Sequence, residues 1–356
     1  MQRDGIDNVV YALRKAFSSF GYNEYKMNKF EEYDLYARNK DFLISSNVIT
    51  FNDTNGKLLA LKPDVTLSIV KNTKIAEGVK KVFYAENVYR VSSKSNGFKE
   101  IPQMGLECIG ELDLYSVSEV ITLAKKSLDV ISSDNVLEIS PVGVVFDFVN
   151  SLNLKSQVKK EVYKLIDGKN EFELKELLIN NSVNGNDVDI LTQLVSLYGP
   201  AKIVIDKLKS LFSGKQEQRL VENFEKILLS MDEETFNSVM VDCSACKNVK
   251  YYNDITFRGY VEGLPKAVLS GGRYDGLLKS MGSDNGAIGF AVYLDEIDRL
   301  FKTEKEFDVD VMIIYDGLSD VKKVLEKVKQ LVSEGKTVTA VNTLNQNVAY
   351  KELIKM

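Results

Sequence analysis

The sequence predicts an α+β fold in which helices pack against an antiparallel sheet, and three observations support this prediction. Apolar residues recur at helical spacing over 6–20. The Asn55-Gly56 pair between apolar runs is a strong signal for a hairpin of antiparallel strands. Residues 82–110 read as two further strands joined by a polar loop. At 356 residues the chain exceeds a typical single domain, so two or three structural units are expected.

The composition narrows the classes of protein. The net charge is −5 and the basic residues are spread thinly, which argues against a surface that binds nucleic acid over its whole extent. No apolar run is long enough to span a bilayer, so no membrane partner is expected, and the N-terminus lacks the apolar core of a signal peptide. Three cysteines without a secretory signal predict a cytoplasmic, reducing location.

The chain contains no histidine, which removes the usual general base, the usual partner of a nucleophile and the commonest zinc ligand. Most hydrolase, metalloenzyme and catalytic-triad functions are therefore excluded. Cys243 and Cys246 form a Cys-x-x-Cys pair, but a zinc site needs four ligands and only one further cysteine exists. We expect these cysteines to be structural, with no metal and no cofactor.

The sequence up to residue 235 predicts the following helices and strands, in chain order. The helix over 7–20 ends at Gly21 and leads into an extended run. After the hairpin, residues 61–66 pass from strand to helix, where Asp64 or Thr66 alone predicts a helix cap. A helix over 112–132, a strand over 136–139 and a second helix after Ser140-Pro141 follow. Residues 151–235 read as a polar helical subdomain, and its lysines alternate with acids, as on a solvated face.

Two stretches carry polar groups in patterns typical of a binding pocket. On a strand, Gln103, Gly105 and Glu107 share one face, and the glycine leaves room between an amide and an acid. Such a pair can accept hydrogen bonds from an ammonium and an imidazole, although an exposed polar strand face is the alternative. Gly271-Gly272 permits close approach of the backbone, and Arg273 follows as a fixed cation.

The tail over 303–356 predicts a short α/β unit. Its pattern indicates a strand over 308–315, a helix over 320–333, a strand over 337–341 and a short helix over 349–354.

Several motifs together resemble histidyl-tRNA synthetase, a class II aminoacyl-tRNA synthetase. They are the tyrosines at 251–252, Gly-Gly-Arg-Tyr-Asp-Gly-Leu over 271–277, Gln-x-Gly-x-Glu over 103–107 and Pro-Asp-x-Thr over 63–66. The resemblance implies a class II synthetase-like antiparallel sheet flanked by helices. Residues 1–150 and 236–302 would form this core, 151–235 a helical insertion, and 303–356 a truncated anticodon-binding-like α/β domain. The N-terminal helix resembles the dimer-forming first motif of the class, which implies a homodimer.

The resemblance also implies a set of site residues. Those expected to bind histidine are Asp64, Thr66, Arg90, Gln103, Glu107, Tyr251, Tyr252 and Arg273. Three positions at which the family holds ATP or supports adenylation depart from its pattern, namely Lys99, Lys247 and Glu296. An acid at Glu296, where the family has an arginine, is expected to repel a polyphosphate.

The chain keeps the positions for histidine and departs from those for ATP. In this pattern it is similar to the histidyl-tRNA-synthetase-like regulatory subunit of ATP phosphoribosyltransferase. That resemblance implies a non-catalytic chain within a hetero-oligomer, with the short-form catalytic subunit as its partner and L-histidine as its effector, and with tRNA not expected to bind. The complex would carry out the first step of histidine biosynthesis under feedback inhibition. A competent histidyl-tRNA synthetase and a paralogue that binds another amino acid are the alternatives.

Overall fold

The computed structural model describes residues 5–43, 47–73, 78–91, 97–246, 251–301, 307–316, 320–343 and 348–356. The chain divides into two compact units, Met1–Phe301 and Lys302–Met356, and each is described by itself. Within the described residues, no helix has the length and apolar character required to cross a bilayer.

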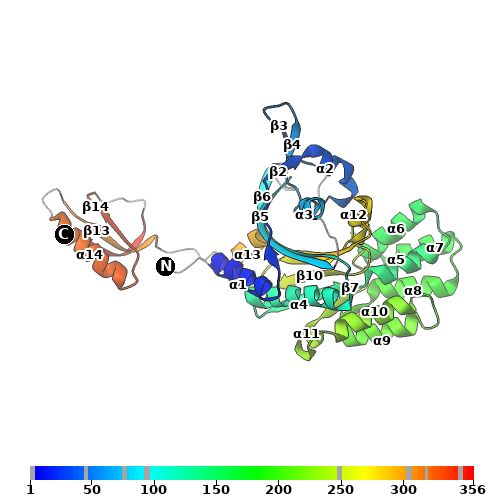
Figure 1. Ribbon diagram of the computed structural model, residues 1–356. Coiled ribbons are helices and arrows are strands. Elements are labelled where there is room, and N and C mark those ends of the chain that lie inside the picture. The colour runs from blue at the N-terminus through cyan, green and yellow to red at the C-terminus, as the bar shows by residue number, and fades with distance from the viewer. Residues whose placement is uncertain are drawn as a thin grey trace. The chain divides into compact units, whose positions relative to one another are not determined.

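The first unit is built on a nine-stranded sheet with the strand order β1-β5-β6-β12-β11-β10-β7-β9-β8 (Figure 1). Neighbouring strands are antiparallel except for the β1–β5 and β7–β9 pairs. The strands are β1 (Asn23–Glu24), β5 (Val79–Val91), β6 (Phe98–Gly110), β7 (Asn135–Ser140), β8 (Tyr198–Pro200), β9 (Met240–Asp242), β10 (Thr256–Val261), β11 (Leu269–Arg273) and β12 (Gly286–Tyr293).

Helices cover one face of this sheet with a continuous apolar core. Helices α1 (Gly5–Ser19), α4 (Leu114–Ile131) and α13 (Leu294–Phe301) lie on this side (Figure 1). Met104, Leu106 and Cys108 of β6 are buried in that core together with Leu13 of α1. Since side chains alternate along a strand, the intervening residues of β6 face the opposite side of the sheet.

The opposite face carries smaller elements. They are the helices α2 (Tyr33–Arg38), α3 (Thr66–Asn72) and α12 (Asp275–Ser280), the 3-10 turn η1 (Lys40–Phe42), and a small antiparallel sheet of β2 (Phe30–Glu32), β4 (Leu58–Leu61) and β3 (Thr50–Asn52). The predicted hairpin at Asn55-Gly56 is confirmed, because β3 and β4 pair antiparallel around it. Gly56 has a φ of +80°, a conformation that favours glycine.

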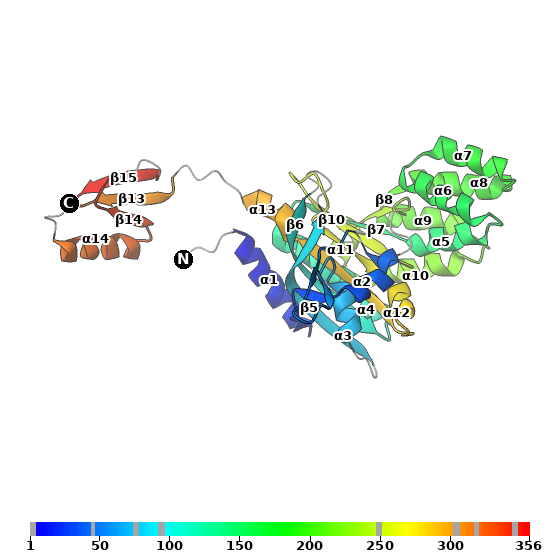
Figure 2. The same cartoon turned by 90° about the horizontal axis from the view of Figure 1, so that it is seen from above.

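Six helices form the segment that was expected to be helical, and α6 to α10 gather at one end of the unit (Figure 2). They are α6 (Ser156–Asp167), α7 (Glu171–Asn180), α8 (Gly185–Ser196), α9 (Ala201–Leu211), α10 (Gln218–Leu229) and α11 (Glu233–Ser238), and they follow α5 (Val142–Ser151). Their buried leucines belong to the same apolar core as α1 and α4. The short strand β8 between α8 and α9 was not predicted.

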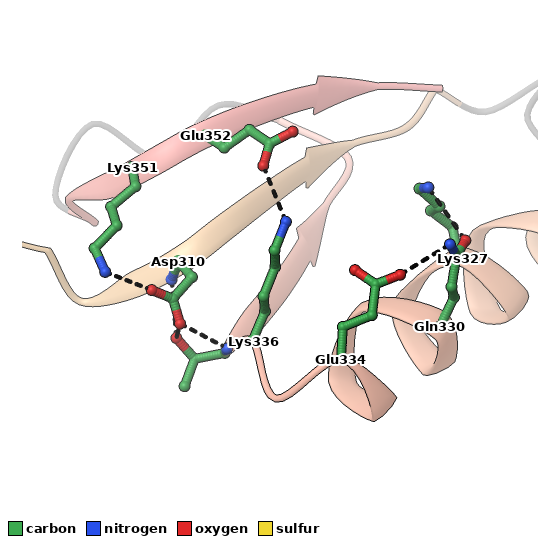
Figure 3. A network of polar contacts seen from close by, with 8 residues as sticks. Asp310, Lys327, Gln330, Glu334, Lys336, Lys351 and Glu352 are labelled. Carbon is green, nitrogen blue, oxygen red and sulfur yellow. Dashed lines mark hydrogen bonds and ion pairs between the residues drawn. The ribbon is translucent and has the colours of Figure 1, made fainter.

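The second unit is a three-stranded parallel sheet with the order β14-β13-β15, packed against one helix. Its elements are β13 (Val309–Ile314), α14 (Val321–Ser333), β14 (Val338–Val341) and β15 (Tyr350–Lys355). Figure 3 shows how polar contacts fasten the strands: Lys351 donates to Asp310 at 2.7 Å, and Lys336 forms an ion pair with Glu352 at 3.4 Å.

The expected short helix over 349–354 is wrong, because residues 350–355 form the strand β15. Val309 pairs with Tyr350 and Val311 with Glu352 along the edge of the sheet. A segment of six residues is too short for a stable helix of its own, so pairing with a neighbouring strand satisfies its backbone better.

Candidate functional site

A cavity of about 580 Å³ lies on the face of the large sheet opposite α1 and α4. Strands β5, β6, β10, β11 and β12 contribute to its floor, and the start of α3, the turn near Phe42 and the tyrosines at 251–252 contribute further parts. Of the eight residues that were expected to bind histidine, all but Arg273 line this cavity. The motifs, which lie far apart in the sequence, therefore meet in one place.

Small residues line part of the floor. Ala291 of β12 and Ser270 of β11 lie opposite one another, and Gly105 of β6 continues this row beneath the ring of Tyr84. In the next row Gly289 lies opposite Glu107, and a Cβ at Gly289 would be 1.8 Å from Glu107 Oε2. Any side chain larger than hydrogen at this position would therefore displace the carboxyl group or close the space above it.

Glu107 lies at the bottom of the cavity and is 2% exposed. Thr66 Oγ1 donates to its Oε1 at 2.7 Å, and the Tyr274 hydroxyl donates to its Oε2 at 2.5 Å. Burial raises the pKa of Glu107 to about 8, although the two hydrogen bonds oppose this shift. The group is thus fixed in position and can carry its proton at neutral pH, or give it up when a cationic or N–H-bearing ligand arrives.

Asp64 lies just before α3 and also lines the cavity. Its Oδ1 accepts a hydrogen bond of 3.0 Å from the Leu67 amide in the first turn of that helix. Burial raises the pKa of this carboxyl group, while the charge of Arg90 opposes the shift. The Arg90 guanidinium lies 4.0 Å from Asp64 Oδ2 and donates to the Pro63 carbonyl at 2.8 Å. Arg90 is therefore already engaged within the protein.

Gln103 offers an unused donor to the cavity. The side chain is 3% exposed, and within the described parts of the chain its Nε2 has no hydrogen-bond partner. A buried donor without an acceptor costs about 1–3 kcal/mol. A ligand with an oxygen or a nitrogen acceptor at this point would remove that cost.

Aromatic rings form part of the cavity lining. The rings of Tyr251 and Tyr252 meet edge to face with their centroids 4.7 Å apart. Tyr251 also packs against Tyr274 at 5.6 Å and against Phe42 at 6.2 Å. Burial raises the pKa of each of these three tyrosines, so their hydroxyls stay neutral donors. A lining of this kind suits a small flat ring with polar edges.

Arg273 is placed outside the cavity. Its Nε donates to Asp275 Oδ2 at 2.9 Å, and its NH1 lies 3.4 Å from Asp254 Oδ2. The reason is the alternation of β11: Ser270 and Gly272 pair with the cavity-facing residues of β12, whereas Arg273 is out of phase with them. Its expected contact with histidine is not supported by this placement.

Of the three residues that depart from the family's ATP pattern, Glu296 and Lys99 lie in different places. Glu296 is buried at the start of α13, accepts from Lys266 Nζ at 3.0 Å and forms an ion pair with Arg299 at 2.9 Å. The two cations offset the negative charge of Glu296 within the protein. Glu296 is therefore not a free anion, and the expected repulsion of a polyphosphate loses its basis. Lys99 is exposed on β6 opposite Arg90 and does not line the cavity. Lys247 lies outside the described residues.

The sequence reasoning missed two groups of lining residues. One is Arg258 of β10, and the other is the pair of Ser270 and Tyr293, whose hydroxyls are 2.6 Å apart. The only sequence signal for Arg258 was its alternation with Thr256 and Tyr260 on one strand. Alternation shows which side of the sheet Arg258 lies on only when the neighbouring strands are known.

The cysteine pair lies in the apolar core. Cys243 and Cys246 are buried free thiols, and burial raises the pKa of both groups. Among the residues with described positions, no group of three or more potential ligands could hold a metal ion.

Comparisons with known proteins agree with this geometry. The model of the histidyl-tRNA synthetase family matches residues 1–297. The ATP phosphoribosyltransferase regulatory subunit of Caldanaerobacter subterraneus subsp. tengcongensis is 31% identical over 343 residues, which cover 93% of this chain and 88% of that protein.

Two solved structures share the fold. A Bacillus halodurans protein described as an ATP phosphoribosyltransferase regulatory subunit/histidyl-tRNA synthetase superposes with a TM-score of 0.80 at 21% identity, over 99% of this chain and 93% of its own. A chain of an ATP phosphoribosyl transferase complex from Thermotoga maritima gives a TM-score of 0.63 at 19% identity, over 80% of this chain and 96% of its own. They confirm the predicted class II synthetase fold. The chain therefore belongs to the histidyl-tRNA synthetase family, in the group of the ATP phosphoribosyltransferase regulatory subunits.

Proposed function

We propose that this chain is a non-catalytic regulatory subunit of ATP phosphoribosyltransferase and that its cavity binds L-histidine. The observation that carries the proposal is the position of Glu107, held by Thr66 and Tyr274 at the bottom of a cavity with aromatic lining. The name of the relative that is 31% identical supports the same role.

The lining groups match the parts of histidine. Glu107 can accept a hydrogen bond from an imidazole N–H, and the tyrosine rings can pack against the imidazole plane. Asp64 provides a second carboxyl group for an ammonium, and the free Nε2 of Gln103 provides a donor for an acceptor atom. The ligand would thereby satisfy a buried donor and a buried acid together.

The proposed partner is the short-form catalytic subunit, within a hetero-oligomer that contains a homodimer of this chain. Histidine inhibits the complex if it favours the arrangement in which the catalytic subunit is less active. The proposed location is the cytoplasm, which is consistent with three free, buried cysteines.

Reconstitution with the short catalytic subunit tests the proposal. The activity of the complex is measured with and without L-histidine for the natural chain and for Glu107→Ala. We expect the variant to assemble and support activity but to lose inhibition by histidine. Glu111→Ala serves as the matched control, because Glu111 is an exposed acid directly after the same strand. Unchanged inhibition in Glu107→Ala would contradict the assignment of the cavity.

A competent synthetase and a paralogue for a different amino acid make other predictions. Histidine-dependent exchange of pyrophosphate into ATP by the isolated chain would favour the synthetase. Calorimetric titration with a panel of amino acids that gives heat with another amino acid, and none with histidine, would favour the paralogue.

A further inference from the structure

Arg258 projects from β10 into the cavity and has no assigned role. It lies directly opposite Ser270 of β11 on one side and Glu138 of β7 on the other. We propose that Arg258 binds the carboxylate of the amino-acid ligand and so makes the cavity select an intact amino acid over the corresponding amine. This inference rests on the proposed function and adds a specificity-determining residue to it.

The first support is the availability of the guanidinium. Arg90 and Arg258 are the basic residues among the described residues that line the cavity. Arg90 is engaged with the Pro63 carbonyl and with Asp64. In the described ranges of the chain the Arg258 guanidinium makes no side-chain hydrogen bond or ion pair within bonding distance, and its charge acts on Glu138 and Tyr252. It is therefore the cation of this cavity that can turn its donors toward a ligand.

The second support is a row of paired strand residues that leads to Arg258. Gly105, Ala291 and Ser270 lie opposite one another on β6, β12 and β11, and Arg258 continues the row on β10. Three strand spacings of about 4.8 Å separate β6 from β10, or roughly 14 Å. Ala291 and Ser270 line the cavity between Glu107 and Arg258, so a ligand whose ring meets Glu107 can extend past them and the Tyr293 hydroxyl toward the guanidinium.

The third support is the set of charges near Arg258, together with the shape of its guanidinium. Glu138 is partly buried beside Arg258, and the positive charge of Arg258 opposes the rise in the pKa of Glu138 that burial causes. Lys169, which also acts on Glu138, is already paired with Asp242 at 3.1 Å. A guanidinium presents two parallel N–H groups that match a carboxylate, whereas an ammonium acts as a point charge. Arg258 thus supplies the fork that the sequence lacks at Lys247.

Isothermal titration of the full-length chain with L-histidine and with histamine, which lacks the carboxylate, tests this inference. We expect the natural chain to bind histidine about 10- to 100-fold more tightly than histamine, since a charge-assisted hydrogen bond provides a difference of this order. Arg258→Met should weaken histidine by the same factor and leave histamine unchanged. Arg219→Met is the control, because Arg219 is an exposed arginine on α10.

A conservative variant distinguishes the loss of the guanidinium from misfolding of the chain. Arg258→Lys keeps the charge but loses the fork, and it should give an intermediate loss of affinity for histidine with no change for histamine. An equal loss for both ligands, or no loss for either in folded Arg258→Met, would overturn the role of Arg258. A natural chain that binds neither ligand would instead overturn the proposed function itself, so the two failures are distinguishable.

Discussion

The hydroxyl of Thr66 donates a hydrogen bond of 2.7 Å to Glu107 Oε1 and joins the first residue of α3 to the C-terminal part of β6. Both residues are buried, and Tyr274 holds the second oxygen of the same carboxyl group. The position of the acid is thus determined by two elements that lie far from it in the sequence. Preorganisation of this kind lowers the cost of ordering a binding group when a ligand arrives.

The close contact at Gly289 predicts a selective loss of binding. In Gly289→Ala the added methyl group would lie 1.8 Å from Glu107 Oε2 and 2.4 Å from the Leu106 carbonyl, so the carboxyl group or the strand must move. We expect histidine affinity to fall by more than about tenfold and stability to fall by about 1–3 kcal/mol. Gly185→Ala is the control, because nothing lies within 4 Å of its added Cβ. Equal affinities for the two variants would contradict this geometry.

The raised pKa of Glu107 predicts a pH-dependent contribution to stability. Its pKa is about 8 in the folded chain against an ordinary value of 4.5, so the folded state holds the proton more tightly. The contribution is therefore complete below about pH 4.5 and is lost as the pH rises through about 8, at up to about 1.4 kcal/mol per pH unit.

Chemical denaturation of the natural chain and of Glu107→Gln at several pH values measures this effect. The natural chain should lose stability relative to the variant between pH 5 and pH 8. A constant difference between the two chains across that range would show that the carboxyl group titrates normally.

The placement of Arg273 predicts a structural role. In Arg273→Gln the hydrogen bonds to Asp275 and the ion pair with Asp254 are lost, so the free energy of unfolding should fall by about 1–3 kcal/mol. Because Arg273 does not line the cavity, the affinity for histidine should change less than about threefold. A large loss of affinity with unchanged stability would restore the role that the resemblance implies.

The ion pairs of Glu296 predict that this residue alone does not block the use of ATP. Glu296→Gln leaves Lys266 and Arg299 without their partner, and we expect a loss of about 1 kcal/mol of stability. We expect no histidine-dependent exchange of pyrophosphate into ATP by this variant. Asp295→Asn, at the preceding position, is the control. The appearance of exchange in Glu296→Gln alone would show that the acid is the barrier.

Local patterns were sufficient to predict much of the site. The alternation of Gln103, Gly105 and Glu107 correctly gave one face of β6, because the two-residue period of a strand needs no knowledge of its neighbours. The Asn55-Gly56 pair correctly gave a hairpin, because its backbone preference is local.

The remaining features depend on contacts between distant segments. The face of Arg258 becomes known only from its pairing with Ser270, and the pairing of β11 with β12 directs Arg273 away from the cavity. Glu296 is neutralised in part by Lys266, which lies 30 positions away in the sequence. Residues 350–355 form a strand because the edge of β13 is available to them.

The central claim is that the cavity above Glu107 binds L-histidine, and a crystal structure of the chain grown with L-histidine tests it most directly. We predict electron density for the amino acid with its imidazole beside Glu107 and the ring of Tyr251. Density for histidine at another place on the chain, with this cavity empty, would contradict the claim.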